Sequence, residues 1–272
     1  MKQWLVKVFG GKPSVTFEQI RKFNLAVAVV LGGQAIAVVL FSASFTVPVY
    51  ASFLTTDNLQ SKLQGQTIVA PGIHEVAHIN LAYVVAAMLL VTAVAYVLQA
   101  TVWRRRYEVW LKKRMQPLRW VVIAVATSLA LCMIGLLAGV QQLESLKSIA
   151  VFMIIASLGL WQLDLQSTQR RISPVAWASL AITLLAALAP WLIVMLSILS
   201  SAVFGAAPAS SMWWLLGTTF IGWTLFAISA HFHRFAVGKW ANYLYAEAWA
   251  TGLVVLIETA LTWQIFGAVL KP

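Results

Sequence analysis

Long, uninterrupted apolar runs constrain this chain more than any other feature of its sequence. A membrane-spanning helix needs about 20 consecutive, mostly apolar residues. The sequence contains seven such runs, at 23–45, 79–103, 120–141, 146–163, 174–204, 212–235 and 241–269. Hydrophobic residues make up 61% of the chain and charged residues only 10%, unlike the composition of a soluble domain. We therefore predict an all-α, multi-pass protein of the cell membrane, surrounded by lipids, in which residues 1–272 form one seven-helix domain.

The distribution of basic residues predicts how the chain crosses the membrane. Most Lys and Arg residues precede the first predicted span or lie in every second loop after it. The remaining loops and the C-terminus carry only Lys62, Lys147 and Lys271. Because short cytoplasmic loops are enriched in Lys and Arg, we predict a cytoplasmic N-terminal segment, residues 1–22, and an extracellular C-terminus. Basic residues beside spans meet anionic headgroups, so the net charge of +11 requires no nucleic-acid partner.

The longest loop, residues 46–78, falls on the predicted extracellular side. It combines alternating β-forming residues, a polar centre and two prolines, Pro48 and Pro71. Such a pattern is typical of strands joined by a turn. We predict a small hairpin or an ordered flap over the outer mouth of the bundle.

The stretch HEVAH, from His74 to His78, matches the H-E-x-x-H pattern of zinc proteases, in which two imidazoles one helical turn apart bind the metal. A catalytic zinc also needs a third protein ligand. The acids on the same face, Asp57 and Glu144, stand in no recognisable ligand motif. We therefore regard His74 and His78 only as a weak metal candidate, and we predict neither a metal centre nor an enzyme.

Glu258 lies inside the last apolar run, LVVLIETALTWQIF, where an ionised carboxylate costs a few kcal/mol. At 100° per residue, four polar residues of this run share one helical face, which we expect to face the bundle interior: Glu247, Thr251, Glu258 and Thr262. Because no Lys or Arg lies near the middle of a predicted span, burial favours the neutral acid. The uncharged groups that could meet it across the bundle are Gln34, Thr92, Tyr96, Thr127 and Ser128. A buried polar clamp with a structural role is an equally good interpretation.

Asp164 ends the fourth predicted span beside Arg170 and Arg171. We expect it to be solvated or ion-paired there, and the alternative is that it closes the inner end of a polar path that includes Glu247. His231 and His233 stand two residues apart near the end of the sixth span. This spacing points them to different helix faces, so an interfacial role is favoured over metal binding.

Several stretches in the same order resemble heliorhodopsins, the rhodopsin family with inverted topology. They are FNLAVAVVLGGQ at 23–34, the F-x-x-P of 45–48, RRYEVWLKKRMQPLRW at 105–120, and the C-terminal stretch from GKWANYL to TALTWQIF within 238–272. The resemblance covers nearly the whole chain. It implies a rhodopsin-like seven-helix bundle with a cytoplasmic N-terminus, and a homodimer to whose interface the outer loop contributes.

The resemblance also identifies two departures. In heliorhodopsins a lysine five residues before the Trp-Gln-Ile-Phe element carries retinal as a protonated Schiff base. Counting back from Trp263 gives Glu258. The family's counterion carboxylate lies two residues after an Arg-Trp pair, and after Arg119 and Trp120 that position is Val122. Because a carboxylate cannot form an imine, we predict that no retinal is attached covalently.

We therefore expect a binding, sensory or regulatory module with an apolar cavity near Glu258. Its ligand would be a lipid, carotenoid or retinoid held without a covalent bond. The expected cavity residues are Glu258, Val122, Thr262, Thr251, Trp263, Gln34, Thr127 and Ser128. The alternatives are proton or cation conduction along the Glu258 stripe, with Glu247 and Asp164 on the path, and a structural subunit for an unknown protein partner.

Overall fold

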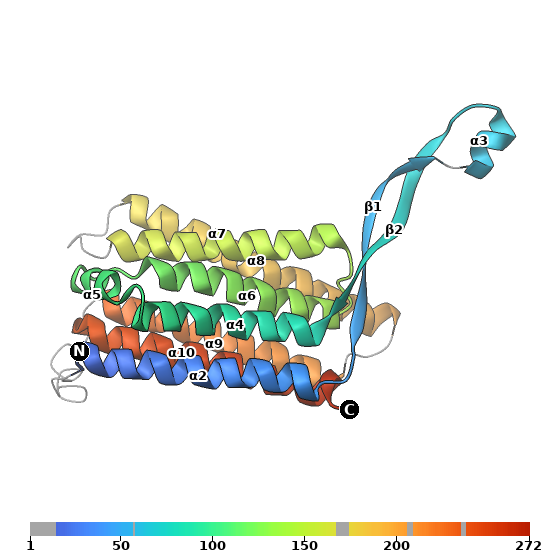
Figure 1. Ribbon diagram of the computed structural model, residues 1–272. Helices are drawn as coiled ribbons and strands as arrows, with labels where there is room; N and C mark the ends of the chain where they lie inside the picture. The colour runs from blue at the N-terminus through green and yellow to red at the C-terminus, as the bar shows by residue number, and fades with distance from the viewer. Residues whose placement is uncertain (1–14, 57, 167–173, 206–208, 235–237) are drawn as a thin grey trace.

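The computed structural model describes residues 15–56, 58–166, 174–205, 209–234 and 238–272. Within these residues, seven helices are long and apolar enough to cross a membrane. They are α2 (Phe17–Phe41), α4 (Leu81–Ala100), α6 (Pro117–Leu137), α7 (Leu143–Gln166), α8 (Pro174–Phe204), α9 (Ser210–Arg234) and α10 (Tyr243–Ile265). Figure 1 shows them running alongside one another as a bundle. The predicted seven-span helical architecture is confirmed.

The helices pack mainly with their neighbours in sequence. α2 contacts α4 and α10, α4 contacts α6, α6 contacts α7, α7 contacts α8, and α9 contacts α10. α6 also contacts α8 and α9, so it is the inner helix of the bundle. The main apolar core gathers buried side chains from most of these helices, including Leu31, Leu89, Ile134, Ile149 and Leu261.

Local sequence signals fix where several helices begin. Thr16 and Gln19 form a capping box at the start of α2, and the Asn80 and Asn242 side chains cap α4 and α10. Pro117 stands in the first turn of α6, where its missing N–H costs nothing. Because α2 begins at Phe17, part of the segment predicted as a separate N-terminal piece belongs to the first spanning helix. Residues 1–14 lie outside the described residues.

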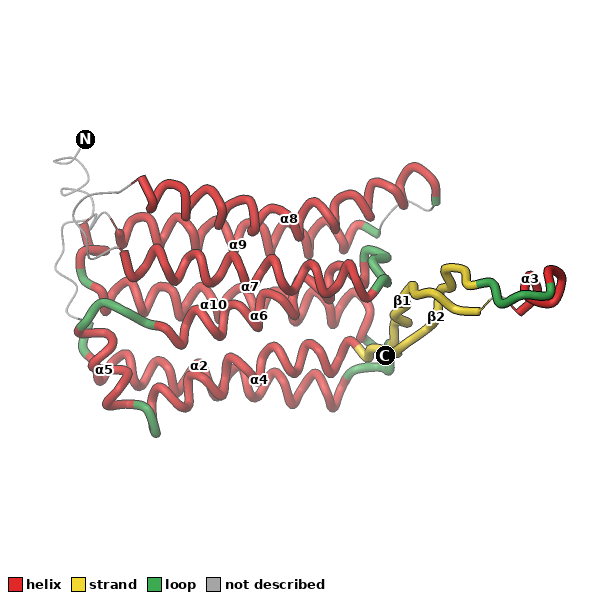
Figure 2. The backbone as a smooth tube through the Cα atoms, turned by 90° about the horizontal axis from the view of Figure 1, so that it is seen from above, coloured by secondary structure: helices red, strands yellow, loops and turns green. Residues whose placement is uncertain are grey.

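A β-hairpin connects α2 to α4. β1 (Thr46–Thr56) pairs antiparallel with β2 (Val69–Asn80), with the short helix α3 (Asn58–Gln64) between them. Val47 and Val49 at its base are buried in the main core, whereas its distal half is largely exposed. The hairpin projects away from the bundle (Figures 1 and 2). The sequence therefore predicted the hairpin correctly, but its placement as a flap over the bundle mouth is wrong.

A short helix that was not predicted, α5 (Arg104–Lys112), lies between α4 and α6. It crosses the end of the bundle opposite the hairpin (Figures 1 and 2). Tyr107 and Leu111, one turn apart, are buried against Ile20 and Tyr243. This contact holds α5 against the ends of α2 and α10. Beyond α9, the chain forms a short 3₁₀ turn, η1 (Gly238–Ala241), and it ends in a π-helical turn, η2 (Phe266–Leu270).

Candidate functional site in the helix bundle

Glu258 lies in the middle of α10 and is 6% exposed. Its Oε1 accepts a hydrogen bond from Thr92 Oγ1 of α4 at 2.7 Å. The same hydroxyl lies 3.3 Å from the Met88 carbonyl oxygen of its own helix. Glu258 Oε2 is buried and has no hydrogen-bond partner among the described residues. Glu258 is therefore a buried carboxyl of which only one oxygen, Oε1, has a hydrogen-bond partner among the described residues.

The polar stripe of α10 faces inward, as predicted. Glu247, Thr251, Glu258 and Thr262 are all buried, and Thr262 is fully inaccessible. Thr262 Oγ1, like Glu258 Oε2, has no hydrogen-bond partner among the described residues. The four side chains share one face because their spacing keeps them within a narrow arc of the helix.

A second polar cluster surrounds Arg119, in the first turn of α6. Its Nη1 lies 2.7 Å from Glu247 Oε2 of α10, and its Nη2 lies 3.5 Å from Asp164 Oδ2 of α7. All three side chains are almost fully buried. No Lys or Arg was expected near the middle of a span, and Arg119 does not contradict this, because it enters the bundle interior at the end of α6. Asp164 pairs across the bundle with Arg119. Its expected neighbours, Arg170 and Arg171, lie outside the described residues.

Neutral donors complete this cluster. Glu247 Oε1 accepts hydrogen bonds from the Tyr107 hydroxyl at 3.1 Å and from Gln116 Nε2 at 3.4 Å. Asp164 Oδ2 accepts from Trp120 Nε1 at 3.1 Å. Burial raises the pKa of Tyr107 well above its ordinary value, so the phenol keeps the proton that it donates. A buried ion pair is tolerated when hydrogen bonds satisfy its remaining atoms. Both Glu247 oxygens meet that condition, whereas Arg119 Nε has no hydrogen-bond partner among the described residues.

A small cavity lies beside the Arg119 cluster. It has a volume of about 10 Å³, and its walls include Tyr96, Gln99, Arg119, Val122, Glu247 and Val254. This is room for one water molecule at most. This cavity lies beside Glu247, and Glu258 is not among its lining residues, so it is not the ligand cavity predicted around Glu258. Val122 does line it, together with Val254, which lies one turn before Glu258.

Residues 20–270 match the family model described as Heliorhodopsin. This chain belongs to the heliorhodopsin family. It shows no significant similarity to a curated protein. The seven helices are therefore a heliorhodopsin-type bundle, and the chain is a multi-pass membrane protein with a rhodopsin-like fold.

Three polar residues expected around Glu258 form their hydrogen bonds with other groups of this heliorhodopsin-family bundle. Gln34 Nε2 donates to Thr259 Oγ1 at 3.0 Å, so Gln34 binds the residue next to Glu258. The hydroxyls of Thr127 and Ser128 donate to carbonyl oxygens of their own helix at 2.6 Å. Thr127 and Ser128 therefore bond to backbone carbonyls and not to Glu258, as a short polar side chain in a helix readily does with the carbonyl one turn back.

Trp263 was also expected to line the cavity, and this expectation is wrong. It is 45% exposed and packs edge-on against Phe266. A separation of five residues turns a helix by about 140°, so Trp263 and Glu258 cannot share a face. Thr262, four residues from Glu258, does share it.

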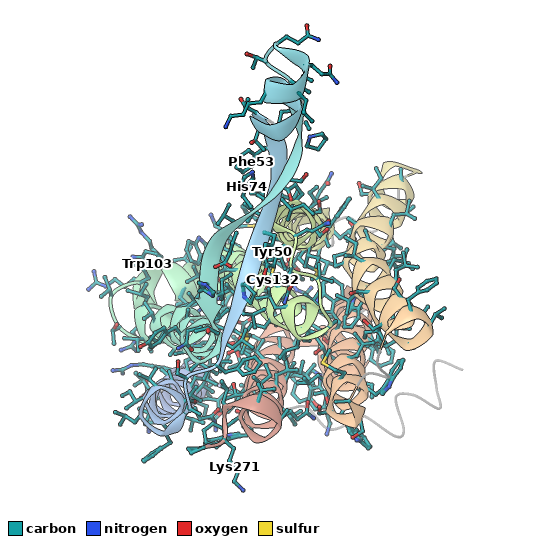
Figure 3. The ribbon with its side chains drawn as sticks, turned by 90° about the vertical axis from the view of Figure 1, so that its right-hand side faces the viewer. Tyr50, Phe53, His74, Trp103, Cys132 and Lys271 are labelled. Atoms are coloured by element: carbon teal, nitrogen blue, oxygen red, sulfur yellow. The ribbon has the colours of Figure 1, made fainter. Side chains whose placement is uncertain are left out.

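The HEVAH stretch lies within strand β2. Four residues of extended chain span about 13 Å, so the helical spacing of a zinc-protease motif does not exist here. His78 Nε2 contacts the Glu75 carboxylate, and His74 stacks on Phe53 with ring centroids 4.5 Å apart (Figure 3). Among the described residues, no group of three or more His, Cys, Asp or Glu side chains could hold a metal ion.

Arg119 was not predicted to lie in the bundle interior, because in the sequence it belongs to the basic loop before the third predicted span. The neighbouring Pro117 was the available signal. Proline favours the first helical turn, which places Arg119 inside the helix.

Proposed function

We propose that this heliorhodopsin-family protein binds no retinal covalently and acts as a non-enzymatic binding, sensory or regulatory module. The observation that carries the proposal is the buried carboxyl of Glu258, at the position where the resemblance places the retinal-binding lysine. The sequence from Tyr243 to Leu270 contains no lysine. A carboxyl group has no amine with which to form an imine, so the Schiff base cannot form at this site.

The contacts of Glu258 support a neutral carboxyl. The Thr92 hydroxyl has one proton but lies within hydrogen-bonding distance of two oxygens, Met88 O and Glu258 Oε1. If Glu258 carries a proton on Oε1, it donates to Thr92 Oγ1 while Thr92 donates to Met88, and both contacts are satisfied. Burial without a paired cation favours the same protonated form.

A neutral Glu258 leaves Oε2 as a hydrogen-bond acceptor, with the unpartnered Thr262 hydroxyl on the same face of α10. We infer that the ligand is a lipid, carotenoid or retinoid that presents a hydroxyl group to these atoms. The cavity described beside Glu247, of about 10 Å³, is too small for such a ligand, and we propose that side chains near Glu258 move as the ligand binds. Binding should therefore change the packing around α10.

An absorption spectrum recorded after addition of all-trans-retinal tests this proposal. The native protein should give no red-shifted Schiff-base band. Glu258→Lys combined with Val122→Glu restores the amine and an anion, so it should give a visible pigment if the pocket accepts retinal. Glu258→Lys alone is the matched control and should lack the red shift, because the Schiff base has no designed counterion. A visible band in the native protein that survives extraction would overturn the proposal.

Conduction of protons or cations is the second candidate, and the continuous burial of the α10 stripe favours it. Glu247, Thr251, Glu258 and Thr262 form an inward polar face along much of the span. Flux through liposomes that contain the protein should then fall strongly in Glu258→Gln. Flux that is absent, or equal in the two proteins, would exclude this candidate.

A homodimer that uses the hairpin is the assembly we propose, with a cytoplasmic N-terminus and an extracellular C-terminus. The register places Leu54, Val69 and Ile73 on one face of the two-stranded ribbon. All three are more than half exposed. An exposed apolar face of this kind marks an interaction surface, which also suits the alternative of a structural subunit with another protein partner.

A further inference from the structure

The outward face of α5 carries a dense group of cations. Tyr107 and Leu111 point into the bundle and are buried. On the opposite face of a nine-residue helix, the period of 3.6 residues places Arg105, Val109 and Lys112, with Arg106 at its edge. Lys113 follows immediately, and all five of these side chains are exposed.

The acidic groups near this face are already engaged with other cations. Glu108 pairs with Arg104 at 3.0 Å. Glu18 of α2 lies within 4.0 Å of Arg21, Lys22 and Arg104. Among the described residues, neither Arg105, Arg106 nor Lys113 forms an ion pair with a carboxylate. The face therefore presents positive charge that the protein itself does not neutralise.

Because α5 follows directly after the end of a spanning helix, we expect its charge to lie near lipid headgroups. α4 ends at Ala100, and α5 begins only four residues later. Helix α5 lies across the end of the bundle, and the neighbouring Trp103 lies at its outer edge (Figures 2 and 3). Val109 of α5 is 48% exposed, and Val102, in the turn that precedes the helix, is 76% exposed. Exposed apolar and basic side chains on one short helix are typical of a helix that lies in the membrane interface.

We propose that the outward face of α5 binds the headgroups of anionic phospholipids, with Arg105, Arg106 and Lys113 as the principal contacts. This surface is separate from Glu258, so the inference does not depend on the proposed function. The inference is also independent of which side of the membrane α5 lies on. It requires only that the leaflet in contact with α5 contains anionic lipids. Each Lys or Arg at an anionic surface contributes about a factor of five in affinity.

Native mass spectrometry tests this inference. The full chain is purified in micelles doped with equal amounts of phosphatidylglycerol and phosphatidylcholine, and the ratio of the two lipids that remain bound is measured. The native protein should retain phosphatidylglycerol in several-fold excess. The triple variant Arg105→Gln, Arg106→Gln, Lys113→Gln should reduce that excess by a factor of about five or more.

The matched control removes three exposed lysines elsewhere, as Lys62→Gln, Lys147→Gln, Lys271→Gln, and it should keep the native preference. A charge-preserving variant, Arg105→Lys with Arg106→Lys, should also keep it. Equal retention of the two lipids by the native protein would overturn the inference. A loss in the lysine control as large as in the α5 variant would overturn it too, because the effect would then reflect total charge.

Discussion

Glu247 and Glu258 are buried glutamates of the same helix with opposite surroundings. Glu247 is paired with Arg119 at 2.7 Å and accepts two further hydrogen bonds. Glu258 has a single hydrogen-bond partner, the Thr92 hydroxyl, and no cation within ion-pairing distance among the described residues. The same substitution at the two positions should therefore have different consequences.

Glu258→Gln should change the free energy of unfolding by less than about 1 kcal/mol, since a neutral amide has nearly the shape and hydrogen-bonding capacity of the protonated acid. Glu247→Gln should lower it by about 3 kcal/mol or more, because Arg119 loses a buried anionic partner. Thermal unfolding of both variants in the same detergent measures the difference. Equal destabilisation by the two substitutions would contradict a neutral Glu258.

His233 gives a pH-dependent prediction. It lies beyond the spanning segment Ser210–Ser229, and its Nδ1 is 3.1 Å from the Trp240 carbonyl oxygen. Burial is the main cause that lowers the pKa of His233, and the positive charges of Arg119 and Arg114 add to it. The Trp240 carbonyl and the Asp164 carboxylate raise the pKa, but the net shift is downward. The unfolded chain therefore binds a proton at a higher pH than the folded chain. Stability should fall as the pH decreases through the ordinary histidine range.

His233→Asn should reduce this pH dependence, because an asparagine amide can still donate to the Trp240 carbonyl but does not titrate. The measurement is the thermal midpoint between pH 7.5 and pH 5 for both proteins. A native protein whose midpoint is constant over that interval would contradict the prediction, as would an asparagine variant with the native slope.

At the scale of elements, apolar length was sufficient to predict the spanning helices, and the fifth predicted span coincides with α8, Pro174–Phe204. Helix α5 escaped prediction because it is short and basic, and only Tyr107 and Leu111, one turn apart, form its buried face. The pairing of Arg119 with Asp164 and Glu247 joins three helices. It could not be predicted, because local sequence carries no information on which helix ends meet.

The contact between α7 and α8 depends on a glycine. A Cβ added at Gly159 would meet Thr183 Oγ1, and it would lie 3.0 Å from Thr183 Cβ. Thr183 is buried, and its hydroxyl already donates to the Ser179 carbonyl oxygen at 2.7 Å. Gly159→Ala should therefore destabilise the protein by about 1–3 kcal/mol, as overpacking commonly does. Thermal unfolding checks this value.

Two further variants separate this clash from a general effect of alanine. In the background of Thr183→Ala, Gly159→Ala should cost much less, because the obstructing side chain is gone. Gly217→Ala in α9 is the matched control, since an added Cβ there meets no atom within 4 Å. It should be neutral or stabilising by up to about 1 kcal/mol. Additive costs at positions 159 and 183 would contradict the proposed close contact.

At the scale of the whole molecule, the hairpin has a buried base and an exposed distal face. Val49 is 1% exposed and packs in the main core, whereas Leu54 and Ile73 are 69% and 74% exposed. A two-stranded ribbon is marginally stable by itself in water. A second copy of the chain that covers the apolar face would supply the missing burial, in agreement with the proposed homodimer.

Leu54→Ser combined with Ile73→Ser should convert the dimer to a monomer without changing the thermal midpoint of the monomeric bundle, because both side chains are exposed within one chain. Val49→Ala should do the opposite: it should lower the free energy of unfolding by about 2 kcal/mol through a cavity in the core and leave the dimer intact. Light scattering after size-exclusion chromatography, corrected for bound detergent, measures the oligomeric state. Two results would show that this hairpin face does not form the interface. One is a native protein that is monomeric in a mild detergent, and the other is a Leu54→Ser, Ile73→Ser variant that remains dimeric.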